Sequence, residues 1–562
     1  MKYNRLVTIA TSLSILLVGC DKDFLDTKLN TQQTPESIAS SAGSLFSSAW
    51  AFYTPLREGF TAIDNNLFAT VSDEAQNNNP TYNALYFNQG LISPNINPDA
   101  GIYKAYYEGI RAANNFLDYA QNSEAFIRIG RDPVIDLPII EVDRQNVKWL
   151  KAEAHIAKAY YYAELIKRFG GVPIVTETLQ KSGRKDIPRS SYDEVVEYIV
   201  KEIDDHKGDL QVNWRTSTFS ANDGRFSLGA ALALKARVLV HAASPRNNPT
   251  EDLAKWRRAA AACNELFTIP GLDLELHRFY GSYFTGANTL TSKETIFAIR
   301  RPANNTIERE NYPIATPGGQ GSISPSDNLV SAYEYKGTPV PTNPYANRDP
   351  RFDVTIVYNG ATWNSRTIDQ SAGGTDDMNK ANASKTGYYV RKFHNDNLNL
   401  IQNQTAQHNW VVFRYAEVLL NYAEAMNEAY GPDANNGYSK TARQALNEVR
   451  NRFSVQMPPV TAAIAADKIA FRDAIKRERR IELAFEDHRY WDLLRWKDAE
   501  VVLNQPIVGV QVTKVSSNPN VWSYTKRNVA TRTFNKDAHY YYPFTRAEVV
   551  NSNNTLVQNP GY

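Results

Sequence analysis

The chain has 562 residues, of which 62 are Lys or Arg and 60 are Asp or Glu, so the formal net charge is +2. This balance, with no long run of either sign, excludes the basic face that nucleic-acid binding requires. Hydrophobic residues make up 42% of the chain, which is enough for a large core, and the two cysteines, Cys20 and Cys263, exclude a disulfide framework.

The first 19 residues have the features of an export signal. Two basic residues precede an apolar run over 6–18, which is too short to span a bilayer as a helix. The run ends at Gly19 and Cys20, in the order of a bacterial lipobox, where the cysteine is lipidated and begins the mature chain. We therefore predict a signal peptide over 1–19, a lipid on Cys20 and a polar tether over 20–33.

Hydrophobic residues recur at helical spacing through the first half of the mature chain. A helix is expected to begin at Thr34, and Ser191 with Glu194 forms a capping box at the start of another. Gly170-Gly171 marks the end of the helix that contains Leu165. The further predicted helices cover 103–117, 147–165, 191–206, 228–243 and 256–267.

The middle of the chain, about 270–405, has a different composition. It is rich in Gly, Pro, Asn, Ser and Thr, with short β-like runs at 295–299 and 354–358. A loop-rich stretch of this length is usually functional. Helices are expected again from Val411, over 442–453 and over a charged run at 467–496.

These helices pair as helix–turn–helix units with Ala and Tyr at the contact positions, as in tetratricopeptide packing. The predicted fold is therefore mainly α, with a tetratricopeptide-like helix-pair core over 34–268 and 411–562. A long loop-rich, minor-β region over about 270–405 is expected to bind the ligand. The whole of 34–562 is predicted to be a single domain.

Several motifs follow one another along the chain in a characteristic order. They are Asp23-Phe24-Leu25-Asp26, Arg348-Asp349-Pro350-Arg351-Phe352, Gly387-Tyr388-Tyr389-Val390-Arg391-Lys392-Phe393, Arg414-Tyr415-Ala416-Glu417-Val418-Leu419-Leu420, Arg477-Glu478-Arg479-Arg480-Ile481-Glu482-Leu483 and Gln558-Asn559-Pro560-Gly561-Tyr562. In this order they resemble the SusD/RagB-like family of Bacteroidetes outer-membrane nutrient-binding lipoproteins. Two departures are Asp487, where the family often has Gly, and Phe544, where it often has Ile.

The resemblance implies a lipid-anchored, surface-exposed protein of the outer membrane that captures a glycan and delivers it to a SusC-like TonB-dependent transporter. It implies no cofactor and no enzymatic activity. Two alternatives stay open: a peptide-binding member of the same family, and a lipid-anchored glycoside hydrolase that reuses the scaffold.

No catalytic constellation is found in the residues themselves. There is no HExxH, no GxSxG elbow and no His/Cys cluster at zinc spacing, so no metal site is predicted. In the charged run 477–495, acidic and basic residues alternate. Their spacing predicts i,i+3 and i,i+4 ion pairs along a helix rather than an active site.

The ligand site is predicted from polar loops. Asp and Asn side chains are dense over 63–79, between two helices, and they suit the donors and acceptors of sugar hydroxyls. Arg391 ends a loop and adds a rigid fork of donors, while Tyr82, Tyr86, Tyr106 and Trp363 are candidate stacking faces. The predicted ligand-binding residues are Asp64, Asn65, Asn66, Asp73, Tyr106, Trp363 and Arg391. Because the early loop contains Asp and Asn rather than aromatic rings, a fructan such as levan is the leading ligand.

Overall fold

The structure is a computed structural model in which residues 41–178, 187–215 and 222–562 are described. Cys20 and the helix expected from Thr34 lie outside these residues. The described chain forms two compact units. One contains 41–48 and 119–147, and the other contains 49–118 and 148–562.

The smaller unit is helical. It contains α6 (Ser123–Arg128), most of α3 (Ala42–Ala49) and the first part of α7 (Leu137–Phe169). Arg131 pairs with Asp143 at 2.6 Å, and Arg144 pairs with Glu124 and Glu141.

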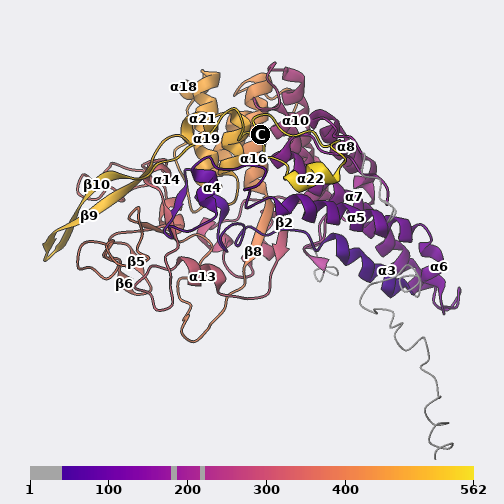
Figure 1. Ribbon diagram of the computed structural model, residues 1–562, viewed down its shortest axis with the longest axis horizontal. Helices are drawn as coiled ribbons and strands as arrows, with labels where there is room; N and C mark the ends of the chain where they lie inside the picture. Colours follow the sequence, from indigo (N-terminus) through magenta and orange to yellow (C-terminus); the bar gives the residue numbers. More distant parts are fainter. Residues whose placement is uncertain (1–40, 179–186, 216–221) are drawn as a thin grey trace, which may run out of the picture. The chain divides into compact units, whose positions relative to one another are not determined.

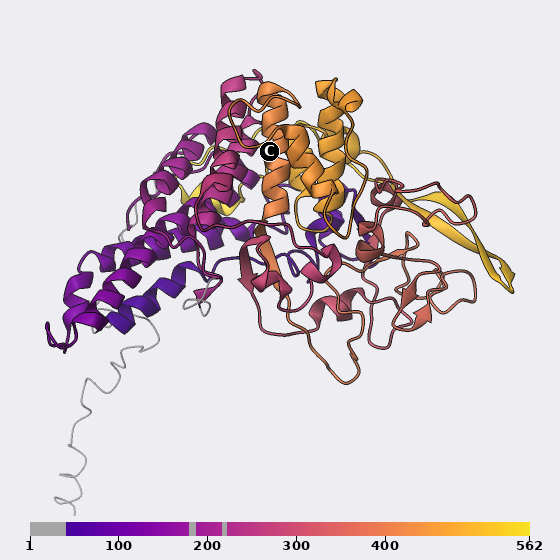
Figure 2. The same ribbon diagram turned by 180° about the vertical axis from the view of Figure 1, so that it is seen from behind.

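The core of the larger unit is a stack of paired helices, as the sequence predicts. α9 packs between α8 and α10, α10 packs on α16, and α16 contacts α17 and α19. Figures 1 and 2 show the orange helices of residues 415–482 beside the purple and magenta helices of residues 192–268. The helices of this core are α5 (Gly101–Ala120), α7, α8 (Tyr192–His206), α9 (Leu228–Ala243), α10 (Leu253–Thr268), α16 (Tyr415–Tyr430), α17 (Ala442–Arg450), α19 (Lys468–Glu482) and α20 (Arg489–Trp496).

The local signals for these helices are confirmed. The Ser191 hydroxyl accepts from the Glu194 backbone, and the Glu194 side chain accepts from the Ser191 backbone, which completes the capping box. α7 ends before Gly170, whose φ of +72° is favourable only for glycine. At Gly109 a Cβ atom would lie 2.5 Å from the Tyr161 ring, so glycine permits α5 and α7 to approach closely.

The region between α10 and α16 is built from loops and very short elements. Its strands form small antiparallel pairs: β2 (Thr295–Arg300) with β8 (Asn409–Arg414), β4 (Ile356–Tyr358) with β7 (Tyr388–Val390), and β5 (Thr362–Trp363) with β6 (Arg366–Thr367). The remaining strand, β3 (Ile323–Pro325), pairs with β1 (Ala75–Asn77) of the early loop. A longer hairpin of β9 (Ile507–Ser517) and β10 (Asn520–Ala530) projects from the larger unit in Figure 1. The remaining short helices are η3 (Trp50–Phe52), η4 (Phe68–Val71), α4 (Ala84–Asn88), η5 (Lys207–Asp209), α11 (Tyr280–Tyr283), α12 (Asn288–Thr291), α13 (Thr306–Asn311), α14 (Asp327–Val330), α15 (Arg351–Thr355), α18 (Ala462–Ala465), α21 (Ala499–Val502) and α22 (Arg546–Asn551).

Four local predictions are wrong. Residues 411–414 are strand β8, because they pair with β2, and the helix begins only at Tyr415. The predicted β-like run 354–358 is a strand only in its last three residues, as β4, because its first two residues end α15. Residues 507–530 form a hairpin inside a region predicted to be helical. The charged run 467–496 is broken between α19 and α20, where Asp487 has a φ of +60°. Glycine adopts that conformation without strain, which accounts for the family's preference for Gly there.

The charged residues of α19 form a buried ion network rather than pairs along one helix. The Glu482 carboxylate accepts from Arg414 at 2.7 Å, Arg452 at 2.6 Å and Arg351 at 2.8 Å. These arginines come from β8, from the loop after α17 and from α15. The other buried members of the network are Glu294, Asp349, Lys392, Arg450, Glu478 and Glu486. The charged run is therefore structural, as predicted. Of the predicted i,i+3 and i,i+4 pairs along a helix, Asp492 with Arg495 at 2.8 Å is present, while α19 forms its ion pairs mainly with other elements.

We expect Glu482→Gln to lower the free energy of unfolding by about 3–5 kcal/mol, because it leaves three buried guanidinium groups short of one anion. Arg477→Gln is the matched control on the same helix. Its side chain is 54% exposed, and we expect a change within about 0.5 kcal/mol. Urea unfolding measures both, and equal effects would contradict the role given to the network.

Candidate ligand-binding site

An open groove of about 650 Å³ lies in the loop-rich region and contains Arg391. Its walls come from three segments that are distant in sequence: 281–286 in and after α11, 353–354 in α15, and 391–397 after β7. The polar side chains that line it are Ser282, Thr285, Asp353, Arg391, Lys392, His394, Asn395, Asp396 and Asn397. The pairing of β4 with β7 brings the second and third segments together.

Arg391 is held at the edge of this groove by two acidic residues. Its Nε and Nη2 donate to the Asp396 carboxylate at 2.9 and 2.7 Å, and its Nη1 donates to the Asp353 carbonyl at 3.1 Å. These bonds occupy three of the five guanidinium N–H donors. The side chain is 29% exposed, so a guanidinium fixed in position remains partly open to solvent.

Trp363 lies beneath Arg391, with its ring 6.0 Å from the guanidinium carbon. It is fully buried among Tyr312 and Tyr389, and its Nε1 donates to the Thr316 hydroxyl. The prediction that Trp363 offers a stacking face is therefore corrected, because its ring is covered and supports Arg391 from the interior.

Lys392, the next residue along the chain, fixes the groove to the ion network. Its Nζ donates to Glu486 at 2.7 Å, to the Tyr280 hydroxyl at 2.8 Å and to the Ala484 carbonyl at 2.9 Å. Burial lowers the pKa of Lys392 to about 8, although the Glu486 charge opposes this shift. The backbone at Arg391 is thus tied to the same network that contains Glu482.

Asp64 and Asn65 form a tight loop with positive φ angles of 52° and 56°. The Asp64 carboxylate accepts from the backbone nitrogens of Asn83 and Ala84 at 2.7 and 3.0 Å, at the start of α4. Asn65 is exposed, and Tyr86 on α4 is 36% exposed. Asp64 therefore positions a helix that presents an aromatic ring to solvent.

Like Trp363, three further predicted site residues lie in the interior. Tyr106 is buried against Tyr161, with ring centroids 5.3 Å apart in the helical core. Asn66 exchanges amide hydrogen bonds with Asn311 at 3.0 and 2.9 Å. For both residues, the predicted contact with a ligand is corrected because their polar or aromatic surface is already covered.

Asp73 is the third interior residue. It accepts from Arg480 at 2.6 Å and from Arg489 at 2.8 Å, and so joins the early loop to α19 and α20. Burial alone would raise the pKa of Asp73, but the two guanidinium groups outweigh it and hold that pKa well below its usual range. Burial and the charge of Asp73 together raise the pKa of Glu74 to about 8.

The structure thus brings Arg391 and Trp363 together, and separately brings Asp64 and Asn65 to α4. Asp353 and Asp396 line the groove together with Arg391, although neither was predicted as a ligand-binding residue. The run Asn395-Asp396-Asn397, four residues after Arg391, is the signal in the sequence that points to this second polar loop.

Comparisons with known proteins agree with this fold. A sequence model of the SusD family matches residues 282–562, and a second, described as starch-binding and associating with the outer membrane, matches 23–240. The first match covers half of the chain, and the protein therefore belongs to the SusD family. The family resemblance and the mainly helical fold expected from the sequence are confirmed.

Individual relatives are distant, and each match covers more than two thirds of both chains. SusD-like protein P38 of Formosa agariphila is 25% identical, covering 76% of this chain and 78% of the relative. A crystal structure of a SusD-like protein of Bacteroides fragilis is 26% identical, covers 94% of this chain and 100% of that one, and has a TM-score of 0.75. A SusD-like carbohydrate-binding protein of the same species is 24% identical, covers 92% and 99%, and has a TM-score of 0.72, which shows the shared fold.

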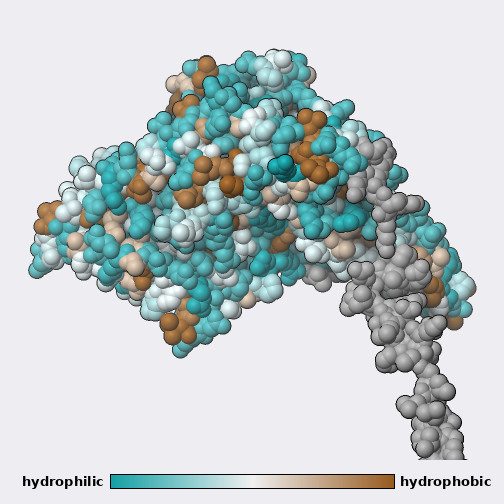
Figure 3. All heavy atoms as spheres, viewed as in Figure 1, coloured by the Kyte–Doolittle hydropathy of each residue, from teal (hydrophilic) through white to brown (hydrophobic). Residues whose placement is uncertain are grey.

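No helix within the described residues is both long and apolar enough to cross a membrane. On the face of the molecule in Figure 3, most residues are hydrophilic and the hydrophobic ones gather only in small patches. That face therefore presents no broad apolar surface.

We expect Asp73→Asn to lower the free energy of unfolding by about 3 kcal/mol at neutral pH, because two buried arginines lose their anion. The folded-state pKa of Asp73 is depressed, so its contribution is complete above its unfolded pKa of about 4 and is lost as the pH falls. The difference between the variant and the wild type should therefore shrink on acidification.

Asp433→Asn is the control, since Asp433 pairs with Arg443 at 2.6 Å on an exposed surface. Denaturant unfolding over a pH series measures all three proteins. A stability difference for Asp73→Asn that stays constant down to pH 3 would contradict the assigned ion pairs.

Proposed function

We propose that this protein captures an oligosaccharide or polysaccharide at the cell surface and delivers it, uncleaved, to a SusC-like TonB-dependent transporter. The observation that carries the proposal is the open groove at Arg391. A fixed guanidinium, two carboxylates and two amides converge there on one hollow of about 650 Å³. Its volume is in the range of sites that hold small molecules or several linked units.

The chemistry of the groove suits sugar hydroxyls. Each hydroxyl both donates and accepts a hydrogen bond, and vicinal hydroxyls require neighbouring donors and acceptors. The remaining N–H donors of Arg391 and the oxygens of Asn395 and Asn397 supply both kinds of group. Because Arg391 is already held by Asp396, binding costs little side-chain entropy.

The comparisons support the same class of ligand. One relative in Bacteroides fragilis is described as carbohydrate-binding, and a protein with the same fold in Bacteroides uniformis is described as a surface glycan-binding protein. The family description that matches residues 23–240 adds association with the outer membrane. A lipid on Cys20 would supply that association.

Levan remains the leading ligand within this class. Tyr106 and Trp363 are covered, and Tyr86 is only 36% exposed, so the candidate loops offer polar groups more readily than broad aromatic faces. Fructofuranose rings lack a flat face and depend on hydrogen bonds. A peptide, the alternative within the family, would use Arg391 for a carboxylate.

The test is calorimetric titration of the mature chain, lacking Cys20, against levan, inulin, starch and pectin, with each mixture checked for cleavage. We expect heat with one glycan, no cleavage, and affinity at least about tenfold weaker in Arg391→Ala, since a hydrogen bond to a charged group is lost. Arg443→Ala, which removes an exposed arginine paired with Asp433, is the control and should bind normally.

Three outcomes would contradict the proposal. Equal affinity of Arg391→Ala and the wild type would show that the ligand does not bind in this groove. Cleaved product would favour the hydrolase. Heat with none of the four glycans, but with a peptide mixture titrated in the same way, would favour the peptide-binding alternative.

The anchor has its own test. We expect Cys20→Ala to move the protein from the membrane fraction to the soluble fraction of cells, because two or more acyl chains bind a bilayer stably and nothing else in the proposal does. Cys263→Ala is the control, since Cys263 is a buried side chain of α10. Membrane association that survives loss of Cys20 would contradict lipid anchoring.

A further inference from the structure

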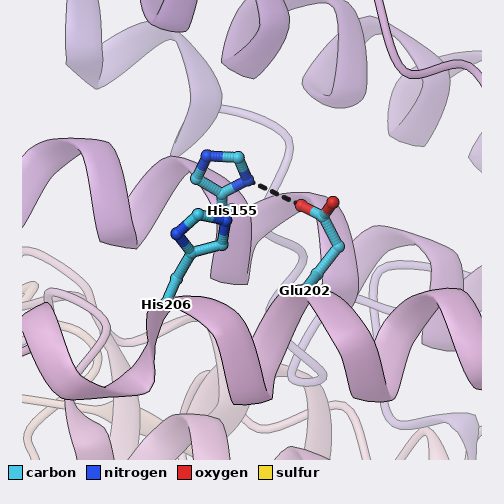
Figure 4. A group of neighbouring side chains, drawn as sticks. All are labelled: His155, Glu202 and His206. Atoms are coloured by element: carbon cyan, nitrogen blue, oxygen red, sulfur yellow. Dashed lines mark hydrogen bonds and ion pairs between the residues drawn. The ribbon is translucent and has the colours of Figure 1, made fainter.

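His155, Glu202 and His206 form a cluster between two helices, distant in sequence from the groove residues. His155 lies on α7, while Glu202 and His206 lie one turn apart on α8 (Figure 4). One ligand atom from each of the three lies within 4.8 Å of the other two, and all three residues are partly exposed. Within the described residues this is the one such group of His, Cys, Asp or Glu.

The geometry of the cluster is already close. His155 Nδ1 lies 2.7 Å from Glu202 Oε2, and the imidazole rings of His155 and His206 are stacked with centroids 3.5 Å apart. The i,i+4 spacing of Glu202 and His206 places both side chains on one face of α8. The capping box at Ser191 fixes where α8 begins and so which face meets α7.

The three side chains are of the types that bind metal ions. Metals take neutral imidazole and ionised carboxylate.

Lys158 is the one cation in contact with the cluster among the described ion pairs. Its Nζ lies 3.3 Å from Glu202 Oε2, and its side chain is only 3% exposed. A carboxylate has two oxygens, so Lys158 can retain one while the other turns toward a metal ion. In that arrangement Lys158 would bind the second oxygen of the Glu202 carboxylate and orient it, as outer partners of metal ligands do.

We propose that His155, Glu202 and His206 bind a divalent transition-metal ion of the zinc class, with water in the remaining position. Two imidazole nitrogens and one carboxylate oxygen are a donor set that Zn²⁺ accepts in tetrahedral sites with one open position. The ion takes the position between His155 Nδ1 and Glu202, and the single N–H hydrogen of the neutral His155 ring then lies on Nε2. Metal–ligand distances of about 2.0–2.2 Å require small side-chain rotations that draw the three ligand atoms closer together.

A bound ion would link α7 to α8, because its ligands come from both helices. An ion that binds the folded chain and not the unfolded one raises the unfolding temperature by mass action. This effect is independent of glycan binding, so it holds or fails separately from the proposed function.

The test uses tag-free mature protein titrated with zinc chloride in competition with a chromophoric chelator. We expect one Zn²⁺ per chain, and affinity at least about tenfold weaker in His155→Gln, Glu202→Gln and His206→Gln. His277→Gln is the control, because His277 contacts only Ser282 and Ser292 through its ring nitrogens and should bind zinc as the wild type does. Zinc should raise the unfolding temperature of the wild type and of His277→Gln alone.

Zinc K-edge absorption of the wild-type complex provides a measurement that needs no variant. Two imidazole ligands and one carboxylate in the metal's coordination sphere would support the site. The absence of binding at about 1 mM zinc, which corresponds to a binding free energy near −4 kcal/mol, would overturn it. Unchanged affinity in His206→Gln would overturn it equally.

Discussion

The carboxylate of Glu482 is held at hydrogen-bond distance from three guanidinium groups in the interior, and much of the larger unit is arranged around that contact. A charge in a low-dielectric interior is costly unless opposite charges surround it, so each partner must be delivered accurately. The arginines come from β8, from α15 and from the chain after α17. The helical core and the loop-rich region are therefore fixed to each other by one network. Lys392 follows Arg391 in the chain and belongs to that network through Glu486. The groove therefore lies beside the buried ion network.

Helices with a continuous apolar pattern were predictable from the sequence, and α9, with bounds of Leu228–Ala243, matches its predicted range. Elements that depend on distant partners were not. Residues 411–414 have helical neighbours in sequence, yet they form a strand because β2 supplies the backbone partner more than a hundred residues earlier. The break between α19 and α20 depends on left-handed backbone at Asp487, and helical periodicity carries no information about that.

The position of a predicted site residue could be foreseen only where it depends on that residue's own exposure. Arg391 lines the groove, although Asp396 and Asp353 already accept from three of its N–H donors. Asp73 is an aspartate like Asp64 and lies in an equally polar segment. It is nevertheless buried, because it pairs with two arginines more than four hundred positions away. The metal cluster illustrates the same limit. The spacing of Glu202 and His206 is visible in the sequence, whereas His155 joins them only because α7 packs against α8.

Hydrogen–deuterium exchange of the mature protein, with and without its oligosaccharide, tests the central claim that the ligand lies in the groove at Arg391. The account predicts slower exchange on binding in the three wall segments, 281–286, 353–354 and 391–397. Helices of the core, such as α9, should exchange at the same rate in both states. Protection confined to other segments, with these three unchanged, would contradict the assignment of the binding site.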